Sequence, residues 1–135
     1  MTIEALDWTS VVHELDAAGC AVVRGVMSQT ECRAYSAAYD DAERYRSRVV
    51  MERHGFGRGE YKYFAYPLPQ PLEAMRSALH GPLAGIANRW HEAMGIEARF
   101  PEALGDFIAR CHAAGQTSIL RILRGQTSIL KLFFN

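Results

Sequence analysis

The sequence has few cysteines and no long apolar run. Its three cysteines, Cys20, Cys32 and Cys111, are odd in number and show no Cys-x-x-Cys spacing. They suggest no disulfide framework and are expected to be small buried hydrophobic residues. The N-terminus lacks the basic and apolar segments of a signal peptide, and no apolar stretch approaches the ~20 residues that a membrane helix needs. These absences predict a cytoplasmic protein without a membrane partner.

Charge of one sign is not in excess either. The 135 residues include fifteen Lys or Arg and fifteen Asp or Glu, which gives a formal net charge of zero. A balanced chain has no overall attraction to a phosphate backbone, so the composition predicts no nucleic-acid partner. A local basic cluster is expected to be a solvated helix face; it consists of Arg44, Arg46, Arg48 and Arg53.

Motifs for metal-dependent or nucleophilic catalysis are absent. A non-haem Fe(II) site needs two histidines and a carboxylate, commonly with a His-x-Asp or His-x-Glu pair on a strand. No histidine here has an acid two residues later, and no G-x-S-x-G occurs. The glycine loop 54–59 lacks the Gly-Lys-Ser/Thr ending of a phosphate-binding P-loop. A structural or surface role is therefore expected for the histidines, which are His13, His54, His80, His91 and His112.

The first elements are short. The pattern over Thr9–Ala18 predicts an amphipathic helix, which Thr9 or Ser10 could cap and which Gly19 ends. The run Cys20–Val23 is apolar and β-branched, so it predicts a short buried strand.

Helical periodicity dominates the rest of the chain. Ser28-Gln-Thr-Glu31 has the form of a capping box and begins a helix predicted to reach about Arg46. Apolar residues three and four apart predict further helices, with Gly115 closing the last of them. These lie over Leu72–Leu79, Leu83–Met94 and Phe100–Cys111, the last with Pro101 in its first turn.

Two other segments favour strands. Glu60–Tyr66 is aromatic and partly alternating, follows the glycine loop and is ended by prolines, so a strand is predicted there. The tail repeats itself, because residues 115–120 recur as residues 125–130. Its two apolar runs are compatible with a β-hairpin or with a helical extension.

The segment Arg53–Pro69 combines aromatic rings, basic side chains and glycines. Such a mixture can line a pocket for an anionic or planar ligand. The alternative is an aromatic strand packed on the helices. The candidate pocket residues are Arg53, His54, Tyr61, Lys62 and Tyr63.

Several segments in order resemble bacterial Fe(II)- and 2-oxoglutarate-dependent oxygenases related to the prolyl-hydroxylase-like enzymes. These segments are Gly19–Ser28, Arg53–Pro69, Ile86–Trp90 and Phe107–Thr117. The resemblance implies a mostly helical α+β fold with a few short strands. Residues 1–117 would form the N-terminal helical layer that supports a double-stranded β-helix. In such a family the cofactors are Fe(II) and 2-oxoglutarate.

The resemblance stops at Ser118, and residues 118–135 form a divergent, repetitive tail. Eight strands of ~5–6 residues need far more chain than this, so the jelly-roll core and its metal ligands are expected to be missing. The chain is thus predicted to be a truncated oxygenase, inactive alone and binding neither cofactor. A small helical module that self-associates or binds a protein through exposed apolar faces is the alternative, and completion by a separately encoded catalytic half is a third interpretation.

Overall fold

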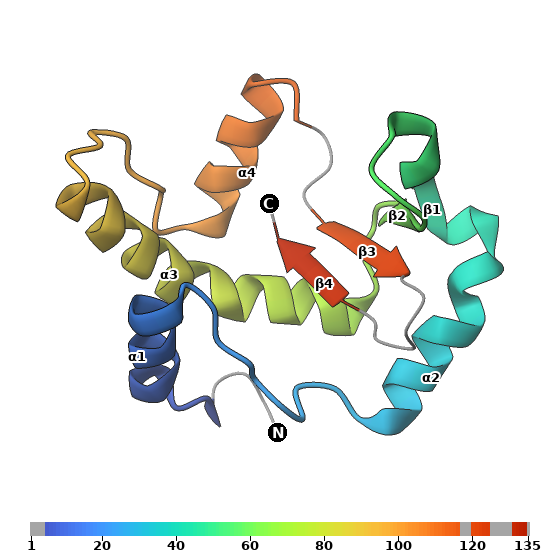
Figure 1. The fold of residues 1–135 in the computed structure, drawn as a ribbon, viewed down its shortest axis with the longest axis horizontal. Helices are drawn as coiled ribbons and strands as arrows, with labels where there is room; N and C mark the ends of the chain where they lie inside the picture. Colours follow the sequence, from blue (N-terminus) through green and yellow to red (C-terminus); the bar gives the residue numbers. More distant parts are fainter. Residues whose placement is uncertain (1–4, 117–119, 125–130, 135) are drawn as a thin grey trace. The chain divides into compact units, whose positions relative to one another are not determined.

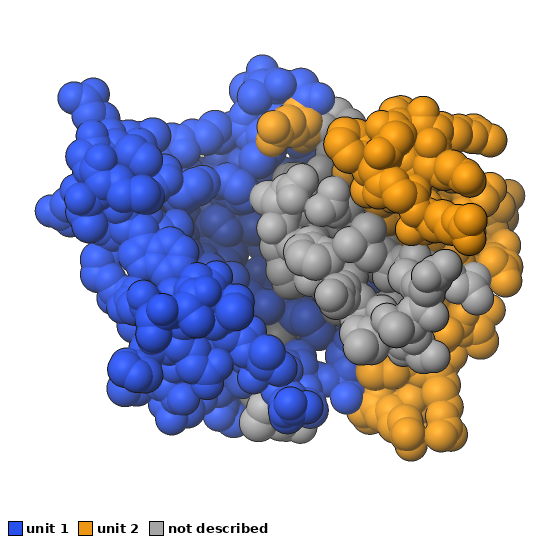
Figure 2. Space-filling view, viewed as in Figure 1, with its two compact units in different colours: residues 1–27, 70–115 blue, residues 28–69, 116–135 orange. Residues whose placement is uncertain are grey.

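The computed structural model describes residues 5–116, 120–124 and 131–134. The chain divides into two compact units, which Figure 2 distinguishes by colour. Unit 1 comprises residues 1–27 and 70–115, and unit 2 comprises residues 28–69 and 116–135. Each unit is therefore built from two separate stretches of sequence.

The described part of unit 1 is helical, with α1 at Trp8–Ala18, α3 at Gln70–Ala93 and α4 at Leu104–Ala113 (Figure 1). Helix α1 is confirmed, but its N-terminal cap is Asp7 and not Thr9 or Ser10, as had been predicted. Asp7 Oδ1 accepts hydrogen bonds from the backbone N–H groups of Thr9 at 3.1 Å and Ser10 at 3.2 Å. Thr9 and Ser10 lie inside the first turn, where their own N–H groups need that acceptor. Gly19 ends the helix with a φ of 69°, as predicted.

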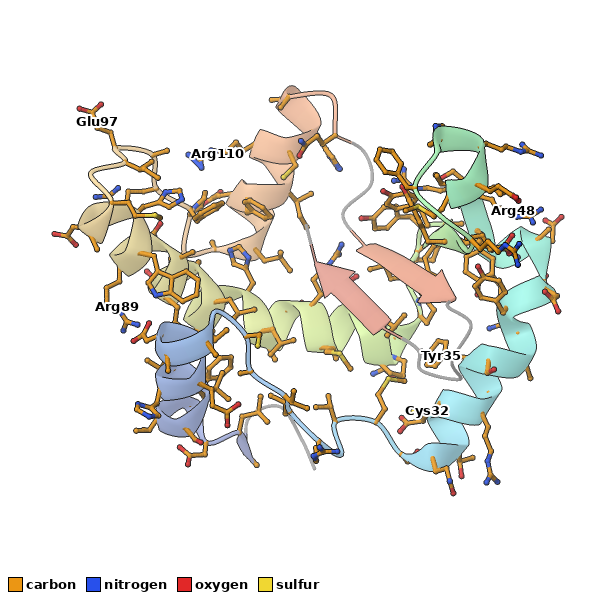
Figure 3. All side chains as sticks on the ribbon, in the orientation of Figure 1. Cys32, Tyr35, Arg48, Arg89, Glu97 and Arg110 are labelled. Atoms are coloured by element: carbon orange, nitrogen blue, oxygen red, sulfur yellow. The ribbon has the colours of Figure 1, made fainter. Side chains whose placement is uncertain are left out.

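An ion-paired contact joins α1 to α3. Both carboxylate oxygens of Asp16 accept from Arg89 Nη2 at 2.7 Å, and Trp90 Nε1 donates to Asp16 Oδ1 at 2.7 Å. Figure 3 shows Arg89 beside α1. The contact lowers the pKa of Asp16, chiefly through the Trp90 hydrogen bond, with Arg89 adding to the effect.

The predicted strand at Cys20–Val23 is wrong. These residues form no strand, and Val22 is 70% exposed. An apolar β-branched run becomes a strand only where another strand supplies hydrogen-bond partners, and the described residues place none beside it. Cys20 and Cys32 are exposed, which corrects the expectation of burial, whereas Cys111 is buried as predicted.

Helix α3 runs without a break for 24 residues, although two helices separated at His80-Gly81 were predicted. Pro82 lies inside it. A proline within a helix removes one backbone hydrogen bond and strains the preceding turn. Apolar side chains are buried on both sides of Pro82, and their packing offsets that cost; they are Leu72, Met75, Ala84 and Ile86.

Helix α4 begins at Leu104, after the predicted start at Phe100. Asn88 of α3 holds Phe100 out of the helix: its Nδ2 donates to the Phe100 carbonyl at 2.9 Å, and its Oδ1 accepts from the Phe100 N–H at 2.7 Å. The Phe100 ring lies edge-on to Phe107 at 6.0 Å. Gly115, with a φ of 77°, follows the end of α4 as predicted.

Unit 2 begins with α2 at Gln29–Ala37. The predicted capping box is present: Ser28 Oγ accepts from the Glu31 N–H at 3.2 Å, and Glu31 Oε2 accepts from the Ser28 N–H at 2.8 Å. The helix ends well before Arg46, however. Two 3₁₀ turns follow, η2 at Ala38–Asp40 and η3 at Ala42–Arg44.

Strand β1, Tyr45–Val50, was not predicted. It pairs antiparallel with β2, Glu60–Phe64. A strand was predicted from the sequence at this second position, over Glu60–Tyr66. Between them lie a short helical turn, η4 at Met51–His54, and the glycine loop. The loop is confirmed: Gly55, Gly57 and Gly59 have φ values of 73°, 84° and 134°, a region open mainly to glycine.

The tail forms strands. Strand β3, Leu120–Arg124, pairs antiparallel with β2, and β4, Lys131–Phe134, pairs antiparallel with β3. The described strands thus make one sheet in the order β1-β2-β3-β4 (Figure 1). Of the two alternatives for the tail, the hairpin is therefore the one observed. The residues between β3 and β4 lie outside those described.

The α+β, mostly helical class is confirmed. None of the described helices has both the length and the apolar content needed to cross a bilayer. The role of the helices as a support layer for a double-stranded β-helix, and the boundary at residue 117, remain predictions from sequence.

Candidate functional site

Strand β2 separates the five predicted pocket residues. Alternate residues of a strand point to opposite faces of the sheet. Lys62 lies on one face of β2, where its side chain is buried and 8% exposed. Tyr61 and Tyr63 lie on the other, where their rings are 5.6 Å apart. Arg53 and His54 are exposed on η4. The structure therefore keeps Lys62 as a buried group and does not bring all five side chains together.

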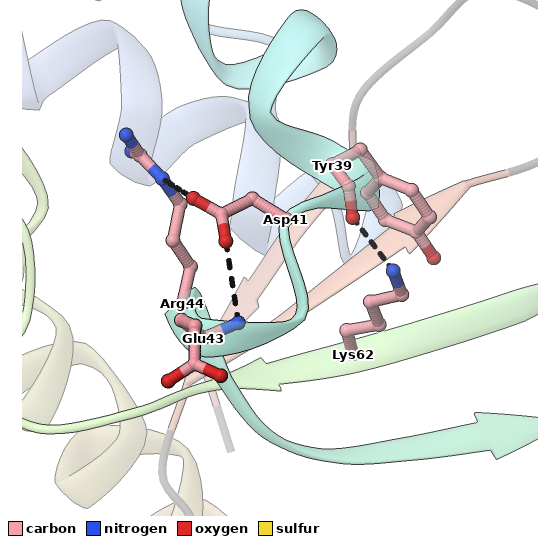
Figure 4. Close-up of polar contacts among 5 residues, drawn as sticks. All are labelled: Tyr39, Asp41, Glu43, Arg44 and Lys62. Carbon is pink, nitrogen blue, oxygen red and sulfur yellow. Dashed lines mark hydrogen bonds and ion pairs between the residues drawn. The ribbon is translucent and has the colours of Figure 1, made fainter.

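Lys62 lies in an aromatic environment. Its Nζ donates to the Tyr39 carbonyl oxygen at 2.6 Å (Figure 4). The same atom lies 4.3 Å from the centre of the Tyr39 ring and 5.1 Å from that of Tyr45. In the described part of the chain no carboxylate forms an ion pair with Lys62. Ring faces and a carbonyl stabilise a buried ammonium, so among the described residues these groups, and no acid, hold the cation.

The aromatic side chains beside Lys62 form the core of unit 2. Tyr39 and Phe64 are each 2% exposed. The Tyr45 ring stacks on Phe64 at 5.2 Å, and Tyr35 meets Phe64 edge-on at 6.2 Å. Burial raises the pKa of both the Tyr45 and the Tyr35 phenol. Tyr45 therefore stays neutral around pH 7 and offers the ammonium a ring face, without a phenolate charge.

A cavity of about 410 Å³ opens beside Lys62. Its walls come from unit 2 alone, from the end of η2, the start of η3, and strands β1 and β2. They are Asp40, Ala42, Tyr45, Arg46, Ser47, Arg48, Glu60 and Lys62. Of the five residues predicted from sequence, Lys62 is the one that lines it.

A β-bulge places Arg46 at this cavity. Tyr45 pairs with Phe64 while Ser47 pairs with Tyr63, so Arg46 is the extra residue of β1. Extra residues at bulges are re-aimed relative to the regular strand. The Arg46 guanidinium carbon lies 6.0 Å from the Tyr63 ring centre and 5.8 Å from that of Tyr66. Arg46 thus rests against aromatic rings and, like Lys62, has no carboxylate partner among the described residues.

Arg48 is engaged differently. It pairs directly across from Lys62 in the sheet register, an arrangement of like charges that is unfavourable by itself. Glu60 relieves it: Arg48 Nε donates to Glu60 Oε2 at 2.7 Å, and Nη2 bonds the same oxygen. Of the three cations that line the cavity, Arg48 is therefore the one that forms an ion pair with a carboxylate in the described part of the chain.

The period of the arginines is the signal that sequence reasoning missed. Arg44, Arg46 and Arg48 recur every second residue, which is the period of a strand and not of a helix. The structure shows Arg46 and Arg48 on β1, so the expected solvated helix face is wrong. Arg44 lies on η3, where its Nε donates to Asp41 Oδ2 at 3.0 Å (Figure 4).

The histidines show no metal site in the described part of the chain. His80 Nε2 donates to the Pro101 carbonyl at 2.9 Å, and His91 Nδ1 donates to the Ala98 carbonyl at 2.7 Å. One nitrogen of each ring is therefore engaged in a hydrogen bond to the backbone. His13, His54 and His112 are exposed. No three His, Cys, Asp or Glu side chains among the described residues lie close enough to hold a metal ion. These residues therefore do not fit an Fe(II) centre.

Comparison with known families identifies the class of protein as an oxygenase. A family model described as "Oxygenase, catalysing oxidative methylation of damaged DNA" matches residues 59–128, just over half of the chain. The protein belongs to this oxygenase family. The matched region contains β2, with Glu60 and Lys62 of the cavity, and it continues past Thr117 into β3.

Two curated proteins of Mycobacterium tuberculosis, from two strains and both named as uncharacterized, are similar to part of the chain. Each is 44% identical over 54 residues, which cover 40% of this chain. The chain spans 23% of the length of these curated relatives. No solved structure matches the chain.

Proposed function

We propose that this chain is part of an Fe(II)- and 2-oxoglutarate-dependent oxygenase that acts on damaged DNA, and that its described residues serve substrate binding. The observation that carries the proposal is the family match over residues 59–128. The resemblance of residues 53–69 and 107–117 to 2-oxoglutarate-dependent enzymes supports the choice of cofactors. The narrower likeness to prolyl-hydroxylase-like enzymes stays a prediction.

The side chains present indicate that the described residues bind substrate and that other residues bind the metal. Because the described residues do not assemble a metal triad, no step through iron is assigned to them, and metal ligands would come from other residues. What these residues offer is a cavity lined by Arg46 and Lys62, two cations that form no ion pair with a carboxylate among the residues that the structure describes. Such groups bind and orient an anionic ligand.

The alternative of a small helical interaction module is not favoured by the family match. Large apolar side chains are exposed, such as Phe56 and Met94, but single exposed apolar residues are ordinary on protein surfaces. Self-association or a protein partner therefore remains a prediction.

Two measurements test the proposal. The purified chain is expected to bind a fluorescent single-stranded oligonucleotide carrying methylated bases, measured by anisotropy. With Fe(II), 2-oxoglutarate and that oligonucleotide, the chain alone is expected to release no succinate. The full-length mycobacterial relative is expected to release succinate under the same conditions. If the relative released no succinate in the presence of the DNA, the oxygenase assignment would be wrong. If the chain alone released succinate, its own residues would bind the metal, and the proposal that other residues do so would be wrong.

A further inference from the structure

We propose that the connection between β1 and β2 binds single-stranded DNA, with a base stacked on the ring of Phe56 and with Arg53 and Arg58 contacting the adjacent phosphates. The inference rests on the proposed function, because it names a surface of this chain that contacts the bases of the damaged DNA. It departs from the prediction, made from overall charge, that nucleic acid does not bind.

Phe56 is exposed in a loop whose backbone is fixed by hydrogen bonds. The connection between β1 and β2 consists of η4 and the glycine loop (Figure 1), and Phe56 within it is 74% exposed. The Phe56 N–H donates to the Met51 carbonyl at 3.2 Å, and the Gly55 N–H donates to the Glu52 carbonyl at 3.2 Å. These two bonds fix the backbone of residue 56 to the preceding turn.

The same two bonds make the exposure of Phe56 unusual. They form the pattern that ends a helical turn at a left-handed glycine, and Gly55 has a φ of 73°. In this motif the residue after the glycine commonly packs an apolar side chain against the turn that it follows. Phe56 occupies that position but leaves most of its surface in solvent. An exposed ring on a fixed backbone binds a planar ligand at a small cost in conformational entropy.

The charge around Phe56 complements a nucleic acid. Residues 46–58 contain four Arg and one Glu, which leaves three positive charges in excess, while the whole chain is neutral. Arg53 and Arg58 are close to Phe56 in the sequence and are exposed, and neither forms an ion pair with a carboxylate of the described residues. This local excess decides the attraction of a phosphate, because charges more than about 8–10 Å away are screened at physiological salt.

The same charge favours DNA over another protein surface as the occupant of the loop. A protein surface packed on Phe56 would also cover Arg53 and Arg58, and taking cations out of water without acidic partners is costly. DNA supplies a base with a flat face for the ring and phosphates for the guanidinium groups. A single strand suits the loop better than a duplex, because stacked and paired bases in a duplex are covered by their neighbours.

Met94 provides a matched control for the exposed ring. It is 63% exposed, but residues 92–97 contain two Glu and no Lys or Arg. An exposed apolar side chain is ordinary by itself, and acidic neighbours give it no attraction for DNA. Met94→Ala therefore tests apolar exposure alone. Arg33→Gln tests the loss of one positive charge outside the loop, because Arg33 is an exposed residue of α2.

The affinity of the full chain for a fluorescent single-stranded oligonucleotide is measured by anisotropy at several salt concentrations, and circular dichroism checks that each variant folds. Phe56→Ala and Phe56→Leu are expected to weaken binding about tenfold, which is the loss of one base–ring stack. Phe56→Trp should bind at least as tightly as the native chain, because it keeps a ring. Arg53→Gln and Arg58→Gln should each reduce the slope of log affinity against log salt by about 0.7. Both control variants should leave the affinity and the slope unchanged.

A second oligonucleotide of the same length, with abasic sites in place of the bases, separates stacking from charge. The native chain should bind it about tenfold more weakly than the strand with bases, and Phe56→Ala should bind the two strands equally. Native affinity in Phe56→Leu, an equal loss in Met94→Ala, or tighter binding of the matched duplex overturns the site. Succinate release by the mycobacterial relative does not depend on Phe56 of this chain, so failure of the site is distinguishable from failure of the proposed function.

Discussion

The side chain of Asn88 makes two hydrogen bonds to one residue, and its removal should be costly. It donates to the Phe100 carbonyl and accepts from the Phe100 N–H, at 2.9 and 2.7 Å. These bonds hold the segment before α4 against α3. We expect Asn88→Ala to destabilise the protein through this segment, which lies within the region matched by the oxygenase family.

The magnitude follows from the two bonds. Each typically contributes about 1 kcal/mol net, and a buried backbone group left without a partner costs about 1–3 kcal/mol. Both bonds are only partly buried, so water recovers some of that penalty. The expected loss is about 2 kcal/mol in the free energy of unfolding, or roughly 6–10 °C in Tm for a chain of this size.

Urea denaturation followed by far-UV circular dichroism measures the loss, and native-state hydrogen exchange should show faster exchange at the Phe100 amide. Ser77→Ala is the matched control, because Ser77 is an exposed residue of the same helix and such changes stay within about 0.5 kcal/mol. If Asn88→Ala cost no more than this control, the two bonds would not hold α4 in place.

Three further predictions concern local features. Asp16 has a lowered pKa, chiefly through the Trp90 hydrogen bond, so its stabilising effect is present at neutral pH and is lost as pH falls below its ordinary value of 3.8. Unfolding curves of Asp16→Asn and the native chain should differ at pH 7 and converge near pH 2; a constant difference would refute this. Ser28→Ala removes the capping box with Glu31 and should cost about 1 kcal/mol in urea denaturation, whereas an unchanged midpoint would contradict it. Pro82→Ala, at an exposed position inside α3, should raise the free energy of unfolding by about 1 kcal/mol or more, and a lower thermal midpoint would show that the packing around Pro82 needs the proline.

Most features that depend on neighbouring residues could be predicted, although the Asp7 cap of α1 was missed. The capping box at Ser28–Glu31, the left-handed end of α1 at Gly19 and the glycine loop before β2 are confirmed. In each case the atoms that interact are within a few residues of one another, so the local sequence contains both partners.

Features that depend on partners distant in the sequence could not be predicted from the sequence. Residues 45–50 form a strand because β2 pairs with them, and an arginine-rich stretch shows no apolar alternation to indicate this. Cys20–Val23 has the composition of a strand, but no strand of the described residues pairs with it. The helix through Pro82 is continuous because apolar residues on both sides of it are buried.

The candidate site likewise has features that the sequence indicated and features that only the tertiary structure shows. The sequence by itself identified Lys62 as a pocket candidate within a basic, aromatic segment, and it indicated the oxygenase class through residues that the family match confirms in part. Only the tertiary structure decided that Lys62 is buried against Tyr39 and that Arg46 and Arg48 line the same cavity. Sheet pairing and the bulge set these positions, and both arise from backbone contacts between segments that are separate in sequence.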